Sequence, residues 1–129
     1  MKGYLLDTHV LLWAAGNPKQ LSNKCRFILE RRKEDRFFSM ASVWEIAIKS
    51  GLGKLTLPTS CEEFITTCQS DLGFSVLSLE LRHVCATERI ELHHRDPFDR
   101  IIIAQALNEG LAILSQDSSF DSYGIQRIW

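Results

Sequence analysis

The sequence has few cysteines, the residues that cross-link small domains, and it has no apolar run long enough to span a bilayer. Its four cysteines are scattered, with no CxxC pair and no histidine at metal-ligand spacing. Each is expected to act as a small apolar residue on a helix, which argues against a zinc site and against disulfides. They are Cys25, Cys61, Cys68 and Cys85.

No linker, internal repeat or low-complexity segment interrupts the chain, and hydrophobic residues make up 45% of it. A length of 129 residues suits one compact unit with one core. We therefore predict that residues 1–129 form a single domain.

A strong excess of charge of either sign is missing as well. Lys and Arg number 15 against 16 Asp and Glu, for a net charge of −1. A general RNA-binding module is usually basic, so a role on nucleic acid would need local positive charge or bound cations that offset an acidic site. The densest charge run, residues 31–36, is expected to be a solvated helix end and loop; a phosphate-contacting rim is the alternative.

The N-terminal segment MKGYLLDTHVLLWAAG has the apolar content of a signal peptide but not its layout. Asp7 and His9 interrupt the apolar run, and there is no separate basic region or clean cleavage site. We interpret the segment as a strand followed by a helix, and we expect a cytoplasmic protein with no membrane partner.

Apolar strand-like runs alternate with helical patterns along the chain. Strands are predicted at 3–7, 37–40, 74–77, 111–115 and 125–128, and helices at 9–15, 22–33, 41–50, from 60, at 78–90 and from 97 to about 110. Ser60, with Glu63, and Ser78 are the expected caps of their helices. The alternation predicts a three-layer α/β/α domain with a central parallel sheet, and the wholly apolar 111–115 fits a central strand.

Two acids follow predicted strands, at the edge where sites form in open α/β sheets. Asp7 ends the first strand, and Asp117 follows the fourth by two residues. Taken singly, each is explained as a cap, Asp7 of the helix that follows and Asp117 of the turn after it. If the two strands are neighbours, however, the two carboxylates meet at one edge.

Glu45 lies in the helix predicted at 41–50. Its apolar neighbours occupy a wide arc, which predicts a largely buried helix, while Ser42, Glu45 and Lys49 share the remaining stripe. Either that stripe is a surface with a Glu45–Lys49 pair, or it faces a cleft.

Asp96 and Asp99 open the helix that begins at Pro97. Asp96 suits the N-cap and Asp99 the third helical position, so capping and the helix dipole account for both. The helix behind them is apolar enough to pack on the sheet, so its N-terminus should lie near one sheet edge, and we expect that edge to be the one that carries Asp7.

Four converging carboxylates repel one another, and the repulsion is relieved by protons or a cation. All-oxygen ligands favour Mg²⁺ or Mn²⁺, which suits phosphodiester hydrolysis. The histidines compete poorly as catalysts, since His93 and His94 are adjacent in a loop and His9 and His83 sit in separate helices. The chain also has no GxSxG elbow, P-loop or GxGxxG.

The segments YLLDTHVLLW, SVWEIAIKSGLGKL, HHRDPFDRIIIAQA and LSQDSSF together resemble the VapC-type toxins of the PIN-domain nuclease family. The resemblance runs in order from Asp7 to Asp117 and so covers nearly the whole chain. It implies a PIN-like parallel-sheet fold and Mg²⁺- or Mn²⁺-dependent ribonuclease activity. It also implies a homodimer and neutralisation by a co-encoded antitoxin.

By this resemblance the four acidic positions, catalytic and metal-binding, fall on Asp7, Glu45, Asp99 and Asp117. DRIIIAQA matches the stretch that begins at the catalytic aspartate, so Asp99 is chosen there and Asp96 becomes a cap or outer ligand. Thr8 and Ser115 resemble the small hydroxyl residues that orient the acids.

The sequence therefore predicts the toxin of a type II toxin–antitoxin system, an endoribonuclease that hydrolyses RNA with metal-activated water. The alternatives are a non-catalytic interaction protein of the same fold, a nuclease that acts on DNA, and a metal-dependent phosphatase. The presence of all four acids argues against the first, and the lack of a DxD pair after the first strand argues against aspartyl-phosphate phosphatases.

Overall fold

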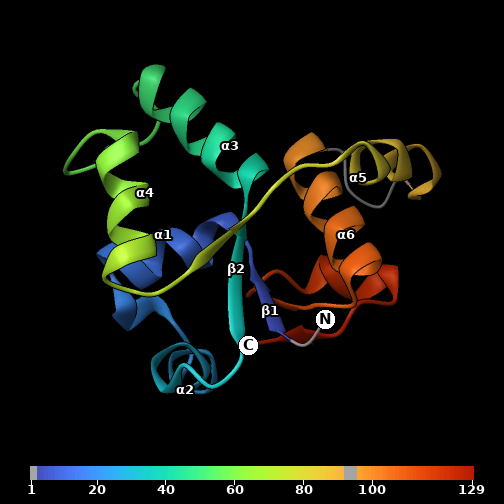
Figure 1. Ribbon diagram of the computed structural model, residues 1–129, viewed down its shortest axis with the longest axis horizontal. Helices are drawn as coiled ribbons and strands as arrows, with labels where there is room; N and C mark the ends of the chain where they lie inside the picture. Colours follow the sequence, from blue (N-terminus) through green and yellow to red (C-terminus); the bar gives the residue numbers. More distant parts are fainter. Residues whose placement is uncertain (1–2, 92–95) are drawn as a thin grey trace.

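A five-stranded parallel sheet forms the centre of the molecule, seen in a computed structural model that describes residues 3–91 and 96–129 (Figure 1). The strand order is β3-β2-β1-β4-β5. The bounds are β1 Gly3–Leu6, β2 Asp35–Ser39, β3 Ser75–Leu77, β4 Ala112–Leu114 and β5 Arg127–Ile128. The predicted parallel sheet is confirmed, with strand ends shifted by up to two residues; the expected loop at His93 and His94 lies outside the described residues.

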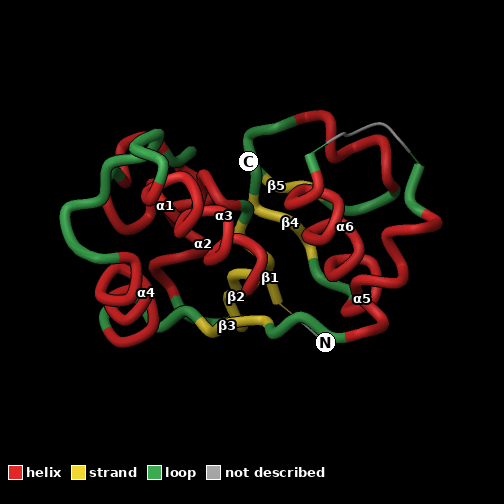
Figure 2. Tube along the Cα trace, turned by 90° about the horizontal axis from the view of Figure 1, so that it is seen from above, coloured by secondary structure: helices red, strands yellow, loops and turns green. Residues whose placement is uncertain are grey.

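Helices cover both faces of the sheet, which gives the three layers seen from above in Figure 2. One face carries α1 (Thr8–Gly16), α2 (Asn23–Arg31) and α4 (Cys61–Ser70). The other carries α6 (Pro97–Glu109), with α5 (Leu81–Ala86) packed on it. The helix α3 (Met40–Gly51) rises from the end of β2 and contacts both α4 and α6. Short 3₁₀ turns lie at Pro18–Gln20, Thr87–Arg89 and Ser118–Tyr123.

The two central strands β1 and β4 send apolar side chains to both faces, as a sheet covered on two sides requires. In β1, Leu6 enters the core under α1 and α2, while Leu5 enters the core under α6. In β4, Leu114 and Ile113 divide in the same way. Burying one such side chain contributes about 1.5–3 kcal/mol, so the two cores fix the sheet between its helical layers.

The helix ends follow the predicted caps in most places. The hydroxyl of Ser60, a predicted cap, accepts the amide of Glu63 at 3.2 Å, and that of Ser22, which was not predicted as a cap, accepts the amide of Cys25 at 3.0 Å. Gly110 ends α6 with φ of 65°, the left-handed conformation that favours glycine. All four cysteines are free thiols on helices, as expected.

The helix predicted at 78–90 is wrong in its start and its length. The helix α5 begins at Leu81, and Glu80 rather than Ser78 is the N-cap. The Glu80 amide donates to His83 Nδ1 at 3.1 Å, a reciprocal cap that the serine signal concealed. The chain then tightens into the 3₁₀ turn at Thr87–Arg89.

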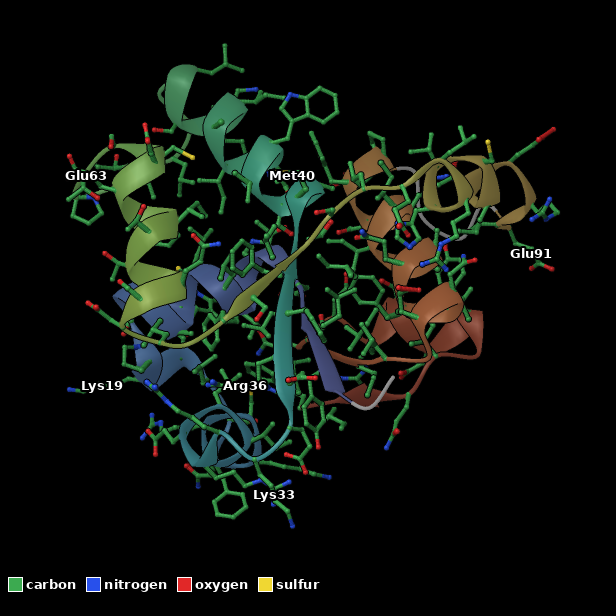
Figure 3. The ribbon with its side chains drawn as sticks, in the orientation of Figure 1. Lys19, Lys33, Arg36, Met40, Glu63 and Glu91 are labelled. Carbon is green, nitrogen blue, oxygen red and sulfur yellow. The ribbon has the colours of Figure 1, made fainter. Side chains whose placement is uncertain are left out.

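The charge run at 31–36 is solvated only in part, because Arg36 belongs to β2 and is 6% exposed. Its guanidinium donates to the carbonyls of Leu29 at 2.6 Å and Gly73 at 3.2 Å and lies over the Phe74 ring. Burial lowers the pKa of this arginine. Arg36 and Met40 lie toward opposite ends of β2 (Figure 3), so this cation is remote from the edge where the strands end.

None of the helices within the described residues is long and apolar enough to cross a membrane.

Candidate acidic site at the strand ends

Asp7 stands at the carboxyl end of β1, between the neighbouring strands β2 and β4. Its amide donates to Leu114 O at 3.1 Å, which fixes the backbone against β4. Its Oδ1 accepts the Val10 amide at 2.8 Å as the cap of α1, and its Oδ2 accepts the Ser115 hydroxyl. Burial raises the pKa of this carboxyl, and the charge of Asp117 raises it further. The predicted cap is therefore present and leaves a second oxygen facing β4.

Asp117 follows β4 and lies near Asp7, as expected if the first and fourth strands are neighbours. Its Oδ1 accepts the Ser119 amide at 3.0 Å and so caps the 3₁₀ turn. Its own amide donates to Ser115 Oγ at 3.0 Å. The Ser115 hydroxyl thus contacts both acidic residues, the position expected of a group that orients them.

Glu45 enters the site from α3 with its side chain buried, at 5% exposure. Oε1 accepts the Thr8 hydroxyl at 2.7 Å, and Oε2 pairs with Lys49 Nζ at 2.6 Å. Thr8 also bonds the Ser42 hydroxyl at 2.9 Å. Of the two interpretations left open for the Ser42–Glu45–Lys49 stripe, the one with an exposed surface is wrong for Ser42 and Glu45, which turn inward.

The expectation that α3 is largely buried is wrong on its apolar side. Met40, Trp44, Ile48 and Leu52 are 41%, 57%, 37% and 64% exposed, and they repeat every four residues along one face. The helical period of the sequence correctly separated a polar face of α3 from an apolar face. In the structure the polar face turns inward, where Thr8 and Lys49 bind the Glu45 carboxylate.

Asp96 and Asp99 reach the same edge from the start of α6. Asp96 is the N-cap, with Oδ1 accepting the Phe98 amide at 2.9 Å, as predicted. Asp99 is partly buried, and its pKa is raised to about 7. Burial is the largest cause, followed by the negative charges of Asp96, Glu45, Asp7 and Asp117. An interaction with every one of these acids requires that they converge, which the sequence alone could not establish.

The donors of this site fit a hard divalent cation. They are carboxylate oxygens, the ligands that Mg²⁺ and Mn²⁺ prefer. Burial is the largest cause of the raised pKa values of Asp7 and Asp99, and the negative charge of neighbouring acids adds to both shifts. Lys49 supplies one such charge: its bond to Glu45 raises the pKa of its amine, and Asp96 and Asp99 add to the shift.

A tighter group of potential ligands lies elsewhere. Within residues 3–91 and 96–129, Glu80, His83 and Glu109 are the set whose ligand atoms all lie within 4.8 Å of one another. Arg82 already bridges the two carboxylates at 2.7 and 2.8 Å. Because His83 Nδ1 accepts a backbone N–H, the neutral ring carries its proton on Nε2 and offers no lone pair there. This group therefore fits a metal poorly.

Two hollows adjoin the acids, and sequence reasoning did not identify them. A hollow of about 530 Å³ is lined by Asp7, His9, Trp13, Gln116, Asp117 and Ser118. A second, of about 430 Å³, lies between α1 and α3 and reaches Glu45, Lys49 and Lys54. His9 and Trp13 line both. Their i, i+4 spacing on α1 is the only sequence signal for this surface, and no prediction was made from it.

The molecule is a three-layer α/β protein, with a central parallel sheet and helices on both faces. Its acidic site lies at the strand ends, where the strand order changes direction between β1 and β4. The chain belongs to the PIN domain family, whose profile matches residues 4–126. No curated protein sequence matches it.

Solved structures share this fold at low sequence identity. A chain of the DNA-bound VapBC2 complex from Rickettsia felis superposes with a TM-score of 0.74 at 12% identity, covering 98% of this chain and 97% of that one. DNA-bound VapBC from Salmonella typhimurium gives 0.72 at 18%, covering 99% and 98%. FitAcB from Neisseria gonorrhoeae gives 0.68 at 18%, covering 98% and 96%.

Proposed function

We propose that this PIN domain, taken as one unit over residues 1–129, is a metal-dependent endoribonuclease and the toxin of a type II toxin–antitoxin pair. The observation that carries the proposal is the convergence of four acids from four elements: burial and the charges of the neighbouring acids together raise the pKa of Asp99 to about 7. A fold needs no such concentration of buried like charge, because each acid destabilises its neighbours. A site that binds a divalent cation does need it, because the carboxylates supply the ligands.

Asp7, Glu45, Asp99 and Asp117 would hold Mg²⁺ or Mn²⁺. When bound, such an ion lowers the pKa of water and neutralises charge on a phosphate. The chain's own residues supply the geometry: Ser115 orients Asp7, and Thr8 with Lys49 holds Glu45. Asp96 caps α6 and thereby sets the position of Asp99.

The route of cleavage follows from the side chains around the acids. Attack by the 2′-hydroxyl usually needs a histidine acid and base, whereas hydrolysis by water leaves a 5′-phosphate and a 3′-hydroxyl. His9 lines the hollow beside Asp7, but His83 is buried against α6 at 0% exposure. We therefore propose the water route; RNA as substrate and a cytoplasmic location come from the resemblance to VapC-type toxins.

The test is mass spectrometry of the products from a single-stranded RNA, with EDTA, Mg²⁺ and Mn²⁺ compared. We expect 5′-phosphate ends, loss of activity in EDTA and recovery with either metal. A substrate with one 2′-deoxy sugar at the scissile position should still be cut. Cyclic phosphate ends, together with activity that survives metal removal, would overturn the mechanism. Cleavage of DNA in preference to RNA would favour the DNA nuclease, and release of phosphate from monoesters alone would favour the phosphatase.

The partner proteins follow from the same proposal. The structures that share this fold include VapBC complexes, FitAcB and a toxin–antitoxin complex from Klebsiella pneumoniae, so we infer a co-encoded antitoxin for this chain. We also propose a homodimer formed through the exposed stripe of α3, defined as Met40, Trp44, Ile48 and Leu52. A continuous apolar stripe on a helix is typical of an interface.

A further inference from the structure

His9 and Trp13 form a ridge between the two hollows beside the acids. They lie one helical turn apart on α1, with ring centroids 5.7 Å apart. Trp13 packs in turn against Trp129, with ring centroids 5.9 Å apart, a contact that restricts the Trp13 ring. His9 is exposed and Trp13 only partly buried, so the ridge is in contact with solvent.

The two sides of the ridge differ in charge. The side toward the sheet holds Asp7 and Asp117, where a scissile phosphate would be bound. The side toward α3 holds Lys54 and Lys49, of which Lys49 already pairs with Glu45. A strand of nucleic acid that passes from one hollow to the other would therefore cross the two rings while its phosphates approach Lys54.

Unpaired bases stack on aromatic side chains in single-stranded RNA recognition, and fixed rings lose little entropy when they do so. We propose that the His9–Trp13 ridge is a stacking platform for the base of the nucleotide next to the scissile phosphate, with Lys54 attracting the next phosphate along the strand. This inference rests on the proposed ribonuclease function and adds the conformation of its substrate: the nucleotide beside the cut is unpaired.

A direct binding test uses Trp13 as its own reporter. The double variant Trp44→Phe, Trp129→Phe leaves Trp13 as the sole tryptophan of the full chain, and Trp13→Phe, Trp129→Phe leaves Trp44. Each is titrated in Ca²⁺ with a single-stranded RNA 12-mer and with the same oligonucleotide made abasic at every position. We expect quenching of Trp13 by the RNA, little quenching by the abasic strand, and no base-dependent change for Trp44. Equal responses to both oligonucleotides at Trp13 would overturn the proposal.

A kinetic test measures the coupling between the ring and the base. One abasic site next to the cut should lower kcat/KM of the unaltered protein by about 5- to 150-fold, the usual range for one stacked base. In Trp13→Leu, which keeps an apolar side chain but lacks a ring, the same abasic site should have little further effect. Trp13→Phe should restore most of the coupling. The control Phe27→Leu alters an exposed ring on α2, away from α3 (Figure 1), and should behave as the unaltered protein.

The two tests separate this inference from the proposed function. Base-dependent quenching of Trp13 without any cleavage would leave the platform standing and remove the ribonuclease assignment. Cleavage without quenching of Trp13, together with the same abasic effect in Trp13→Leu, would support the ribonuclease assignment and exclude the platform.

Discussion

At the scale of single residues, the site is a balance between repulsion and the few groups that relieve it. Asp99 carries the clearest sign of that balance, with a pKa raised to about 7 by burial and by the surrounding acids. Lys49 and the hydroxyls of Thr8 and Ser115 offset the charge of Glu45 and Asp7. They leave Asp99 buried and repelled by the neighbouring acids. The site is therefore expected to destabilise the fold until a cation binds.

The first prediction concerns the pH dependence of stability in EDTA. The pKa of Asp99 is about 7 in the folded chain against 3.8 for the free group, so unfolding releases a proton between those values. The free energy of unfolding should therefore fall as the pH rises from 4 to 7 and change little above 7 on account of this group.

Asp99→Asn should remove that dependence and raise the free energy of unfolding at pH 8 by about 1–2 kcal/mol, or a Tm increase of about 5 °C. Thermal melts from pH 5 to 8 provide the measurement, and Glu30→Gln on the exposed face of α2 is the control. A variant that melts below the unaltered protein at pH 8 would show that Asp99 is not under repulsion.

The second prediction compares two acids at the same edge. Glu45→Gln should lower the cleavage rate by about 100-fold or more, because the substitution removes the negative charge of a buried cation ligand. Asp96→Asn should change it by less than about fivefold, since asparagine is an equally good N-cap for the Phe98 amide. Rates from single-turnover cleavage of one RNA decide the matter. Similar losses in two equally stable variants would mean that Asp96, not Asp99, holds the third position.

At the scale of secondary-structure elements, each acid is positioned by the end of a strand or helix. Asp7 shows the double use most clearly, because one oxygen caps α1 and the other faces Ser115. The helix α3 shows a second double use, with a polar face turned to the site and an apolar face turned to solvent. Substitutions that keep the structural role of such a residue and remove its role in the site should therefore separate stability from function.

The third prediction uses the cap of α1. Asp7→Asn keeps an oxygen for the Val10 amide but deletes the charge, so the fold should stay intact while growth arrest on expression disappears. Asp7→Ala deletes both and should lose about 1 kcal/mol of stability relative to Asp7→Asn. Plating assays with and without expression, and circular dichroism melts of both variants, measure these effects. A folded Asp7→Asn protein that still arrests growth would exclude Asp7 as a ligand.

The fourth prediction concerns the exposed stripe of α3. Trp44→Glu places a charge in the centre of this stripe and should convert a dimer into a monomer at micromolar concentration, as measured by light scattering after size exclusion. Phe27→Glu alters an equally exposed ring on α2 and should leave the mass unchanged. If the unaltered protein is monomeric, or if Trp44→Glu remains a dimer with the same dissociation constant, the stripe is not the interface.

At the scale of the whole molecule, an acidic, partly buried site contrasts with an overall charge of only −1. Long-range attraction therefore contributes little, and recognition depends on the local arrangement of acids, Lys49, Lys54 and the hollows around them. We therefore expect a protein that inhibits the proposed activity to act at that local surface.

The fifth prediction is that the antitoxin covers the acids and places an arginine or lysine among them. Such a cation would pair with the carboxylates and lower the pKa of Asp99 below its value in the free protein. A structure of the complex is the measurement, with the antitoxin's basic residue changed to methionine as the control for inhibition. An antitoxin bound only to the opposite face, with the acids open, would contradict the prediction.

The sequence by itself determined the local features. The period of the apolar residues gave the order of strands and helices, and short polar residues gave most caps, since both depend on neighbours within a few positions. The prediction failed at 78–90 for a related reason, because Ser78 resembled an N-cap while Glu80 and His83 form the cap of α5. The acids of the site could be selected by their places at strand and helix ends and by the resemblance of their motifs.

Only the tertiary structure decided which of these features meet. The placing of β1 between β2 and β4 brings Asp7 and Asp117 together although 110 positions of sequence separate them, and no local pattern encodes that pairing. The inward turn of Glu45 and the burial of Arg36 depend on partners from distant segments, Thr8 for one and Gly73 for the other. Burial of a charge is favourable only when such partners are in place, so its location follows from the folded arrangement of the chain and not from its periodicity.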